Sequence, residues 1–268
     1  MSISVGAAVE RVEAESNFAL ESGAPAEVVE SLGIATLRIG GGVALSMRND
    51  PTRYWSKALG FTEPLTADVV AEVCDFYREQ GNQRAVLQLA PSVLPADWDE
   101  IRAKQGITAG STWVKLAHNG SAVPPVETSL RIDVVGPEHA DEWAAVLLAG
   151  FGMPLDGYQA MFAASLGHPG ITAYGAWDGD RLVAGATLFV DGDAAEFAGA
   201  ATLPSHRGRG AQSAFLARRI ADATAAGRTA LSAETGKPAE GTRNPSLENM
   251  TRVGFEVLYE RVNWVWTA

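Results

Sequence analysis

The chain of 268 residues has very little of several residue types, and each scarcity excludes a class of protein. Cys74 is its only cysteine, so no disulfide can form within the chain, and a reducing, cytoplasmic location is expected. The four histidines are scattered without metal-ligand spacing, which predicts that no metal ion is bound. No apolar run approaches the ~20 residues that span a bilayer, and the N-terminus lacks the basic start and apolar run of a signal peptide.

Basic residues are also in short supply. Lysine and arginine number 21 against 32 aspartates and glutamates, which gives a formal net charge of −11. This excess argues against binding to nucleic acid or to an anionic membrane surface, and it favours a cationic substrate such as an amine. A hydrophobic content of 47% and a charged content of 20% are typical of a globular protein, and the length suits one large domain or two of ordinary size.

Hydrophobic periodicity predicts a mixed α/β protein. The stretch 119–126, with its glycine and two prolines, breaks both periodicities and is typical of a linker. We therefore expect a first domain at 1–120, a linker at 121–127 and a second domain at 128–268.

Each expected domain alternates helices and strands. In the first we expect helices at 5–21, at 66–80 and around Trp98, and strands at 34–39, 43–47, 85–89 and 112–117. In the second we expect helices at 137–149, 158–166, 211–226 and 244–253, and strands at 130–134, 171–177, 182–190, 194–203, 229–233 and within 255–266.

The stretch 202–212 organises the second domain. It follows an apolar strand and opens a long helical pattern. The first turn of a helix has backbone N–H groups without partners and carries partial positive charge, so it binds anions. Gly208 and Gly210 lack a Cβ, so a diphosphate could approach the backbone, and Arg207 and Arg209 add positive charge nearby. The alternative is a surface turn with two charged arginines.

The strand, Pro204, the glycine-containing turn and the helix together resemble the acyl-CoA-binding motif of the GNAT superfamily of N-acetyltransferases. That motif has Gln or Arg, then Gly three residues later, then Gly or Ala two residues after that. Arg207, Gly210 and Gln212 take the three places, and Gln212 departs from the usual last residue. The resemblance covers 128–268 well and 1–120 poorly. It implies an α+β protein with two GNAT-like domains, each a twisted, mostly antiparallel sheet flanked by helices, the first of them degenerate.

The resemblance also implies acetyl-CoA, or another short acyl-CoA, as co-substrate. In the family, the strand before the motif separates from its neighbour, and its backbone binds the pantetheine arm and polarises the thioester carbonyl. Here that role would fall on Ala201, Thr202 and Leu203. The backbone amides expected to hold the diphosphate are those of Arg207, Gly208, Arg209, Gly210, Ala211 and Gln212.

Two carboxylates are candidate general bases. Some family members keep a glutamate in the strand before the motif, and Glu196 matches that position, six residues before Thr202. Strand alternation predicts that Glu196, Ala198, Ala200 and Thr202 share one face, so the carboxyl would be half-buried in the cleft with a raised pKa. It could then accept a proton directly or through water. The alternative is a structural glutamate paired with an arginine on a neighbouring strand. Glu234, at the end of the next strand, is the second candidate.

The proton donor for the leaving thiolate is where this sequence departs from the family. Many members place a tyrosine four residues before a Gly-Phe pair, and the fourth residue before Gly254-Phe255 is Met250, whose thioether cannot donate a proton. Water or a residue outside the motif would then protonate the thiolate. Asn244 and Asn249 keep polar groups on the same helix and are expected to bind the pantetheine arm or a water.

Residues for the acceptor are sought between the first two helices of the second domain, the region that shapes acceptor sites in the family. Asp156 and Tyr158 are the candidates for substrate contact there, and Tyr158 is alternatively a core residue.

The two halves share signs of an internal repeat. Gly81 and Gly227, 146 residues apart (227 − 81), each end a helix that a buried strand follows. At this offset the motif turn 207–210 falls on 61–64. A proline in 61–64 removes an N–H donor, and a glutamate stands where phosphate would lie. We therefore expect the first half not to hold coenzyme A in this manner. The polar, aromatic stretch 49–61 either helps to wall the active half or is a surface loop.

The sequence thus predicts an N-acyltransferase that moves an acetyl or short acyl group from coenzyme A to the primary amine of a small molecule, by direct attack of the amine on the thioester. A non-catalytic acyl-CoA-binding sensor or scaffold and a protein N-acetyltransferase are the alternatives. We expect no nucleic acid, membrane or metal partner, and a monomer or a homodimer.

Overall fold

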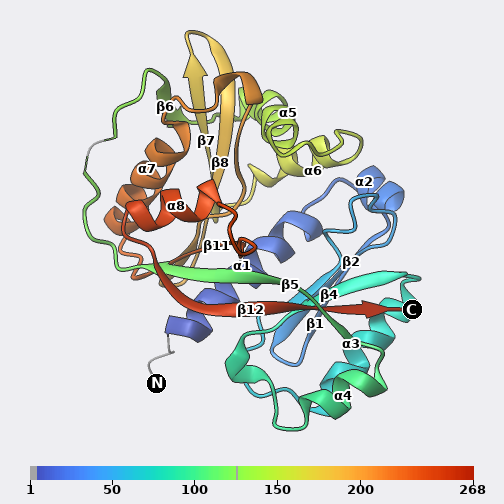
Figure 1. Ribbon diagram of the computed structural model, residues 1–268. Helices are drawn as coiled ribbons and strands as arrows, with labels where there is room; N and C mark the ends of the chain where they lie inside the picture. Colours follow the sequence, from blue (N-terminus) through green and yellow to red (C-terminus); the bar gives the residue numbers. More distant parts are fainter. Residues whose placement is uncertain (1–4, 125) are drawn as a thin grey trace.

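The computed structural model describes residues 5–124 and 126–268 (Figure 1). In the first half the helices are α1 (Val5–Ser22), α2 (Ala26–Leu32), α3 (Ala67–Glu79) and α4 (Trp98–Lys104). The strands are β1 (Ile34–Ile39), β2 (Gly42–Met47), β3 (Lys57–Leu59), β4 (Arg84–Gln88) and β5 (Thr108–His118). Periodicity predicted all of these except α2 and β3, which at 7 and 3 residues are too short to show a repeat.

The second half follows the predicted order of elements. Its strands are β6 (Arg131–Val134), β7 (Ile171–Asp178), β8 (Arg181–Asp191), β9 (Ala194–Glu196), β10 (Ala200–Thr202), β11 (Ala230–Gly236) and β12 (Glu256–Thr267). Its helices are α5 (Ala140–Phe151), α6 (Tyr158–Ser165), α7 (Ala211–Ala225) and α8 (Pro245–Arg252). The expected linker lies within 119–124 and 126–130, which hold no helix or strand, and residue 125 lies outside the described residues.

All the strands belong to one 12-stranded, mostly antiparallel sheet that runs through both halves. Along it the order is β1-β2-β3-β4-β12-β5-β11-β9-β8-β7-β6, and β10 also pairs with β8. Only β3–β4 and β9–β11 are parallel pairs among the described residues. The α+β class, with its twisted sheet flanked by helices, is therefore confirmed.

The two halves exchange their last strands. β5 pairs with β11 of the second half, and β12 lies between β4 and β5, antiparallel to both. Figure 1 shows these two long strands crossing from one half of the molecule to the other, β5 in green and β12 in red. The division of the chain at 121–127 therefore stays a prediction, because each half of the sequence supplies one strand to the sheet of the other.

Helix α1 also belongs to both halves. Its Val9 and Val12 pack against Phe189 and Ala230 of the second half, while Ala14 packs against Leu45 of the first. The same helix buries Glu10 and Glu13 completely. A helix expected to serve the first half alone thus lies across the junction, and it carries two carboxylates into it.

The strand predicted at 194–203 is broken by a bulge. Glu196 pairs with Phe189 and Ala200 pairs with Ala186, so four steps along β9–β10 face three along β8. The amide of Thr187 accordingly donates to both Ala198 O and Gly199 O. The prediction that Glu196 shares a face with Ala200 and Thr202 is wrong, because the extra residue reverses the alternation and places Glu196 on the face of Ala201 instead.

The element order repeats between the halves with small shifts. α3 and α7 begin 144 residues apart (211 − 67), β4 and β11 begin 146 apart (230 − 84), and β5 and β12 begin 148 apart (256 − 108). The repeat inferred from the glycines therefore has the right offset at the strands. At the helix the inferred offset of 146 residues is two residues too long, so the motif turn at 207–210 corresponds to 63–66 and not to 61–64.

Candidate active site

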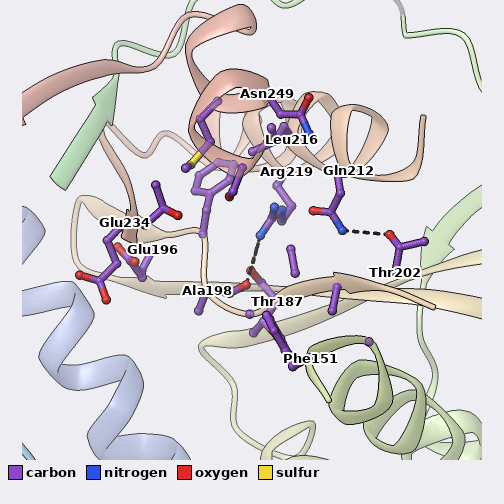
Figure 2. Close-up of a pocket in the computed structure, with 18 of the residues that line it drawn as sticks. Phe151, Thr187, Glu196, Ala198, Thr202, Gln212, Leu216, Arg219, Glu234 and Asn249 are labelled. Carbon is purple, nitrogen blue, oxygen red and sulfur yellow. Dashed lines mark hydrogen bonds between the residues drawn. The ribbon is translucent and has the colours of Figure 1, made fainter. Parts of the chain in front are cut away.

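A cavity of about 1220 Å³ lies at the junction of the two halves. The second half contributes the splayed strands β10 and β11 and the first turns of α7 and α8. The first half contributes α1, the stretch 52–57 and Trp113 of β5. Figure 2 shows its two ends: Glu196 and Glu234 lie beside α1, and Gln212 with Thr202 lies at the opposite side.

Helix α7 begins without a side-chain cap. Its N-cap is Gly210, in the left-handed region at φ 85°, and no side chain accepts a hydrogen bond from the first turn. Because Gly210 has φ > 0, and a Cβ there would lie 2.7 Å from Glu127 O, the backbone requires glycine. The first-turn amides of Ala211, Gln212 and Ser213 therefore face the cavity side of the helix with no internal partner.

The two motif arginines have different surroundings. Arg207 lines the cavity and donates to Thr202 O at 3.3 Å and to Gly150 O at 3.1 Å, so it ties β10 to the end of α5. Arg209 instead forms an ion pair with Asp178, with Nη1 to Oδ2 at 2.5 Å, and its side chain does not line the cavity. Positive charge at the turn therefore comes from Arg207 and the helix, while the Arg209 charge is neutralised outside.

The strands beside the turn separate as they approach it. β9 and β11 pair in parallel only as far as Glu196 and Ser232, after which β10 pairs with β8 and β11 with β5. Leu203 N donates to Val183 O, so ladder alternation turns the Ala201 amide toward β8 and the Ala200 and Thr202 amides away from it. These amides face the gap that β11 has left, where they can bind an acyl thioester and its arm.

A cluster of buried charges closes the other end of the cavity. Arg261 of β12 donates to both oxygens of Glu13, at 2.8 and 2.9 Å, and to both oxygens of Glu10, at 2.9 and 3.0 Å. Lys115 of β5 donates to Glu13 Oε2 at 2.6 Å. Burial alone would raise the pKa of Glu13, but Arg261 and Lys115 together hold it well below the usual range. Glu10 is thus paired with Arg261, and Glu13 is paired with both Arg261 and Lys115.

Glu196 and Glu234 join this buried charge cluster as its third and fourth carboxyls. Ser232 Oγ donates to Glu196 and Arg261 donates to Glu234. Lys115 Nζ lies 3.9 Å from Glu196, so the partner of this glutamate is a lysine and not the arginine of the structural alternative. Burial raises the pKa of Glu196 to about 7, against the attraction of Lys115. Burial and then the charge of Glu13 raise the pKa of Glu234 to about 8. Raised pKa values are typical of carboxyls that serve as general bases or acids.

The geometry corresponds to that of known proteins. No family model matches the sequence, and no curated protein sequence matches it. Among solved structures, a GCN5-related N-acetyltransferase from Kribbella flavida is 19% identical, with a TM-score of 0.62 and 95% of each chain covered. A putative GNAT-family acetyltransferase from Novosphingobium aromaticivorans is 19% identical, with a TM-score of 0.57, covering 90% of this chain and 96% of its own. A tandem GNAT protein of clavulanic acid biosynthesis is 17% identical, with a TM-score of 0.55 and 95% of each chain covered.

The chain has the GNAT N-acetyltransferase fold. Ten of the site residues expected from the sequence line the cavity, namely Glu196, Ala201, Thr202, Arg207, Gly208, Gly210, Ala211, Gln212, Glu234 and Asn249. Gln212, which departs from the family pattern, donates from Nε2 to Thr202 Oγ1 at 3.1 Å and so holds the turn to the strand (Figure 2). Met250 also lines the cavity, so the thioether stands where the family has its tyrosine.

Five expected contacts do not reach the cavity. Asn244 caps α8, accepting from Ser246 N and Leu247 N, and it donates to Gly236 O at 2.7 Å, so its side chain is fully used. Leu203 and Arg209 do not line the cavity, and their expected contacts, which are made by the backbone, stay predictions. Asp156 is exposed and does not line the cavity either. Tyr158 is completely buried and donates to Asp50 Oδ1 at 2.6 Å, which makes it a core residue and not a substrate contact.

The stretch 49–61 is a wall of the cavity and not a plain surface loop. The carboxylate of Asp50 accepts hydrogen bonds from the amides of Thr52, Tyr54 and Trp55, at 2.7, 2.7 and 2.9 Å, in addition to the one from Tyr158. Those bonds fix the loop and lower the pKa of Asp50 despite its burial. Thr52, Tyr54, Trp55 and Lys57 consequently line the cavity from the side of the first half.

Sequence reasoning missed the residues that long-range pairing brings in. Glu10 and Glu13 of α1, Lys115 of β5 and Arg261 of β12 lie far apart in the chain and meet only because the strands are exchanged. A signal was present, since Glu10 and Glu13 share the buried side of α1 with Val9 and Val12. Charged residues among the apolar positions of a helix indicate a buried ionic partner.

No helix within 5–124 or 126–268 is long and apolar enough to cross a membrane. Within the same ranges no three His, Cys, Asp or Glu residues are grouped as metal ligands.

Proposed function

We propose that this protein is an acyl-CoA-dependent N-acyltransferase that transfers an acetyl or short acyl group to the primary amine of a small molecule. The observation that carries the proposal is one continuous cavity with an uncapped helix N-terminus at one end and two buried carboxyls at the other. Anions bind at the first, and protons are exchanged at the second.

Binding of the co-substrate follows from the turn and the splayed strands. The first-turn amides of α7, with Gly208 and Arg207 beside them, would hold the diphosphate. The outward amides of Ala200 and Thr202 would hold the pantetheine arm and polarise the thioester carbonyl. Asn249 stands across the gap on α8 as a further polar contact.

Acyl transfer then needs a proton acceptor near the thioester. Glu196 or Glu234, as the carboxylate, takes a proton from the ammonium form of the acceptor. The freed amine nitrogen attacks the thioester carbonyl, a C–N bond forms and the C–S bond breaks, and coenzyme A leaves as a thiolate. After the attack the nitrogen carries one proton more than the amide product, and it passes this proton to water. Met250 has no proton to give, so water delivers a proton to the thiolate. An unperturbed thiol pKa of about 8.5 makes that leaving group tolerable.

The first half favours a small acceptor over a protein. Helix α1 and the stretch 52–57 cover the acceptor end of the cavity, where a protein substrate would need an open groove. An amine held there is buried against Tyr54, Trp55 and Phe162. A cytoplasmic location, inferred from the single cysteine, accompanies this proposal.

A non-catalytic acyl-CoA-binding protein is the second candidate, because Met250 replaces the expected proton donor. The two candidates differ in one measurement. Tight acetyl-CoA binding without release of free thiol across a broad panel of amines would favour the binding protein.

Ser213 offers a clean test of the diphosphate site, because it lines the cavity in the first turn of α7. Ser213→Glu places a carboxylate where the diphosphate would lie, while an acid in this turn suits the helix dipole and does not disturb folding. We expect the Kd for acetyl-CoA, measured by calorimetry, to rise at least about tenfold through like-charge repulsion. Ser213→Gln, of equal size and no charge, should stay near the wild-type value. An unchanged Kd in Ser213→Glu would refute the site.

A further inference from the structure

Lys57, the first residue of β3, is a buried cation without an ionic partner. The residue is 4% exposed, and its ammonium lies 3.5 Å from the ring centroid of Tyr54 and 5.8 Å from that of Trp55. In the described ranges no carboxylate oxygen comes within 4.0 Å of it, and it donates no hydrogen bond. A buried ammonium usually has a paired acid, so the ring faces satisfy only part of its charge.

Two acids interact electrostatically with Lys57 but do not form an ion pair with it. They are Glu21 and Glu234, which lie beyond ion-pair distance. Burial raises the pKa of Glu21 well above its usual value, and neither of its oxygens has a hydrogen-bond partner. Burial likewise raises the pKa of Glu234 to about 8. Neither carboxyl pairs with Lys57, whose ammonium is therefore left without an acid partner at the wall of the cavity.

Lys57 occupies in the first half the place that Glu196 occupies in the second. In the parallel pair β9–β11, Glu196 lies opposite Ser232, and in the corresponding pair β3–β4, Lys57 lies opposite Val86. Ser232 and Val86 are 146 residues apart (232 − 86), which is the offset between β11 and β4 themselves. Both side chains line the one cavity at the junction, so the repeat presents a cation and an acid to a shared space.

An aromatic wall surrounds the cation. Tyr54 and Trp55 meet edge to face at 5.1 Å between centroids, Trp55 meets Phe162 at 5.7 Å, and Tyr54 meets Trp113 at 6.4 Å. All four rings line the cavity. Such a surface binds the apolar or aromatic body of a ligand and leaves Lys57 as the charged group on that side.

Behind this wall lies a smaller cavity of about 310 Å³ that shares Tyr54, Lys57 and Trp113 with the main one. Arg53 and Arg84 also line it, and none of its lining residues is acidic. The charged residues that line this smaller cavity are therefore all basic, whereas the main cavity also holds the carboxyls of Glu196 and Glu234.

We propose that the acceptor is an amine with an apolar or aromatic body that also carries a carboxylate, and that Lys57 binds this carboxylate while the amine lies toward Glu196 and Glu234. The inference rests on the proposed function and narrows it to amino-acid-like acceptors. Lys57 is a specificity-determining residue in this arrangement. It selects acceptors by charge and takes no part in the transfer of the acyl group.

The experiment compares acceptors that differ only in the carboxylate. The pairs are phenylalanine with phenethylamine, leucine with isopentylamine, and γ-aminobutyrate with propylamine, each assayed with acetyl-CoA by release of free thiol. For the full-length protein, kcat/KM should be higher for the carboxylate-bearing member of at least one pair. In Lys57→Met, whose apolar stem still packs on Tyr54, the ratio of the two kcat/KM values should fall by about tenfold or more, as for a lost charge-assisted hydrogen bond.

Two further variants serve as controls. Lys57→Arg keeps the charge and should restore most of the ratio. Lys237→Met removes the same charge from an exposed lysine paired with Glu260 and should leave the ratio at its wild-type value. Because Lys57→Met replaces an uncompensated buried charge with an apolar group, its thermal unfolding midpoint should not fall, so a loss of ratio will not reflect unfolding.

The outcomes separate the inference from the proposed function. Thiol release with amines that shows no preference for a carboxylate, or a preference unchanged in Lys57→Met, overturns the inference and leaves the acyltransferase standing. If none of the six amines leads to thiol release, the inference and the proposed acyltransferase activity are both overturned.

Discussion

The two halves start their central helices in opposite ways, although the elements around them correspond. Before α3, Thr66 Oγ1 accepts from Val69 N at 3.3 Å, and Leu65 N donates to Val93 O at 2.9 Å. Phe61, Leu65 and Val93 are buried together in the hydrophobic core of the first half. Before α7, Gly210 has no side chain, the first-turn amides are bare, and the strands separate to leave the cavity.

A helix N-terminus that follows a strand is therefore not by itself a binding site. It becomes one only when the cap has no side chain, the preceding residues do not fill the gap, and the neighbouring strand has left. The first half, in which these three conditions are not met, instead supplies its loop at 50–57 and its helix α1 as walls of the cavity of the second half.

Separating the halves should have the largest effect. A fragment 128–268 lacks β5, so β11 has an unpaired edge and the buried charge cluster lacks both Lys115 and the two glutamates of α1. We expect neither this fragment nor 1–127 alone to fold cooperatively, and we expect their co-expression to restore a soluble complex that binds acetyl-CoA. Gel filtration and calorimetry measure this. Cooperative unfolding and acetyl-CoA binding by 128–268 alone would show that the exchanged strand is dispensable.

Glu196→Gln should have a large effect on activity that depends on pH. Because the pKa of Glu196 is raised to about 7, the wild-type carboxyl is protonated below that pH and can accept a proton only above it. The variant should lose about 10²- to 10⁴-fold in kcat/KM at pH 8 and much less at pH 5. Glu240→Gln, at an exposed glutamate, is the control. A wild-type profile in Glu196→Gln together with loss in Glu234→Gln would assign the base to Glu234.

The same variant, which should lower activity at pH 8, should raise the free energy of unfolding at that pH. A carboxyl whose pKa is raised on folding binds more protons in the folded state, so its contribution to stability is lost as pH rises through about 7. Glu196→Gln should therefore gain about 1–3 kcal/mol in free energy of unfolding, relative to wild type, at pH 8 compared with pH 5. Urea unfolding at the two pH values measures it. Equal differences at both would mean that Glu196 titrates normally.

Thr66→Ala should have the smallest effect. Removing the cap of α3 should cost about 1 kcal/mol of stability and leave the Kd for acetyl-CoA unchanged, because that helix end is not a ligand site. Thermal unfolding and calorimetry check the two parts. Weakened acetyl-CoA binding would mean that the two helix ends are not as different as their caps indicate.

Local patterns of the sequence sufficed for most of the fold and one end of the site. Strand, glycine turn and helix are adjacent in the chain, so the α7 turn, Gly210 and the candidate carboxyl Glu196 could be found without knowing any long-range contact. The alternation argument for Glu196 failed at a single bulged residue, which no periodicity reveals.

The charged partners of the two carboxyls at the other end of the site could not be predicted. Lys115 and Arg261 lie on strands β5 and β12, and their partners on α1 are 102 and 248 to 251 residues away in sequence. Which strand lies beside which is decided by burial across the junction, and a single sequence does not record it. The sequence left open whether Tyr158 contacts substrate or lies in the core for the same reason, because its partner Asp50 belongs to the other half.

The position of β12 sets the order in which the protein can become active during its synthesis. It follows every other described element, yet it fills the slot between β4 and β5 and delivers Arg261 to carboxylates carried by the first helix. A nascent chain on the ribosome therefore holds an open sheet and an unbalanced acidic pocket until β12 has been made. The site is complete only once this strand has taken its place between β4 and β5.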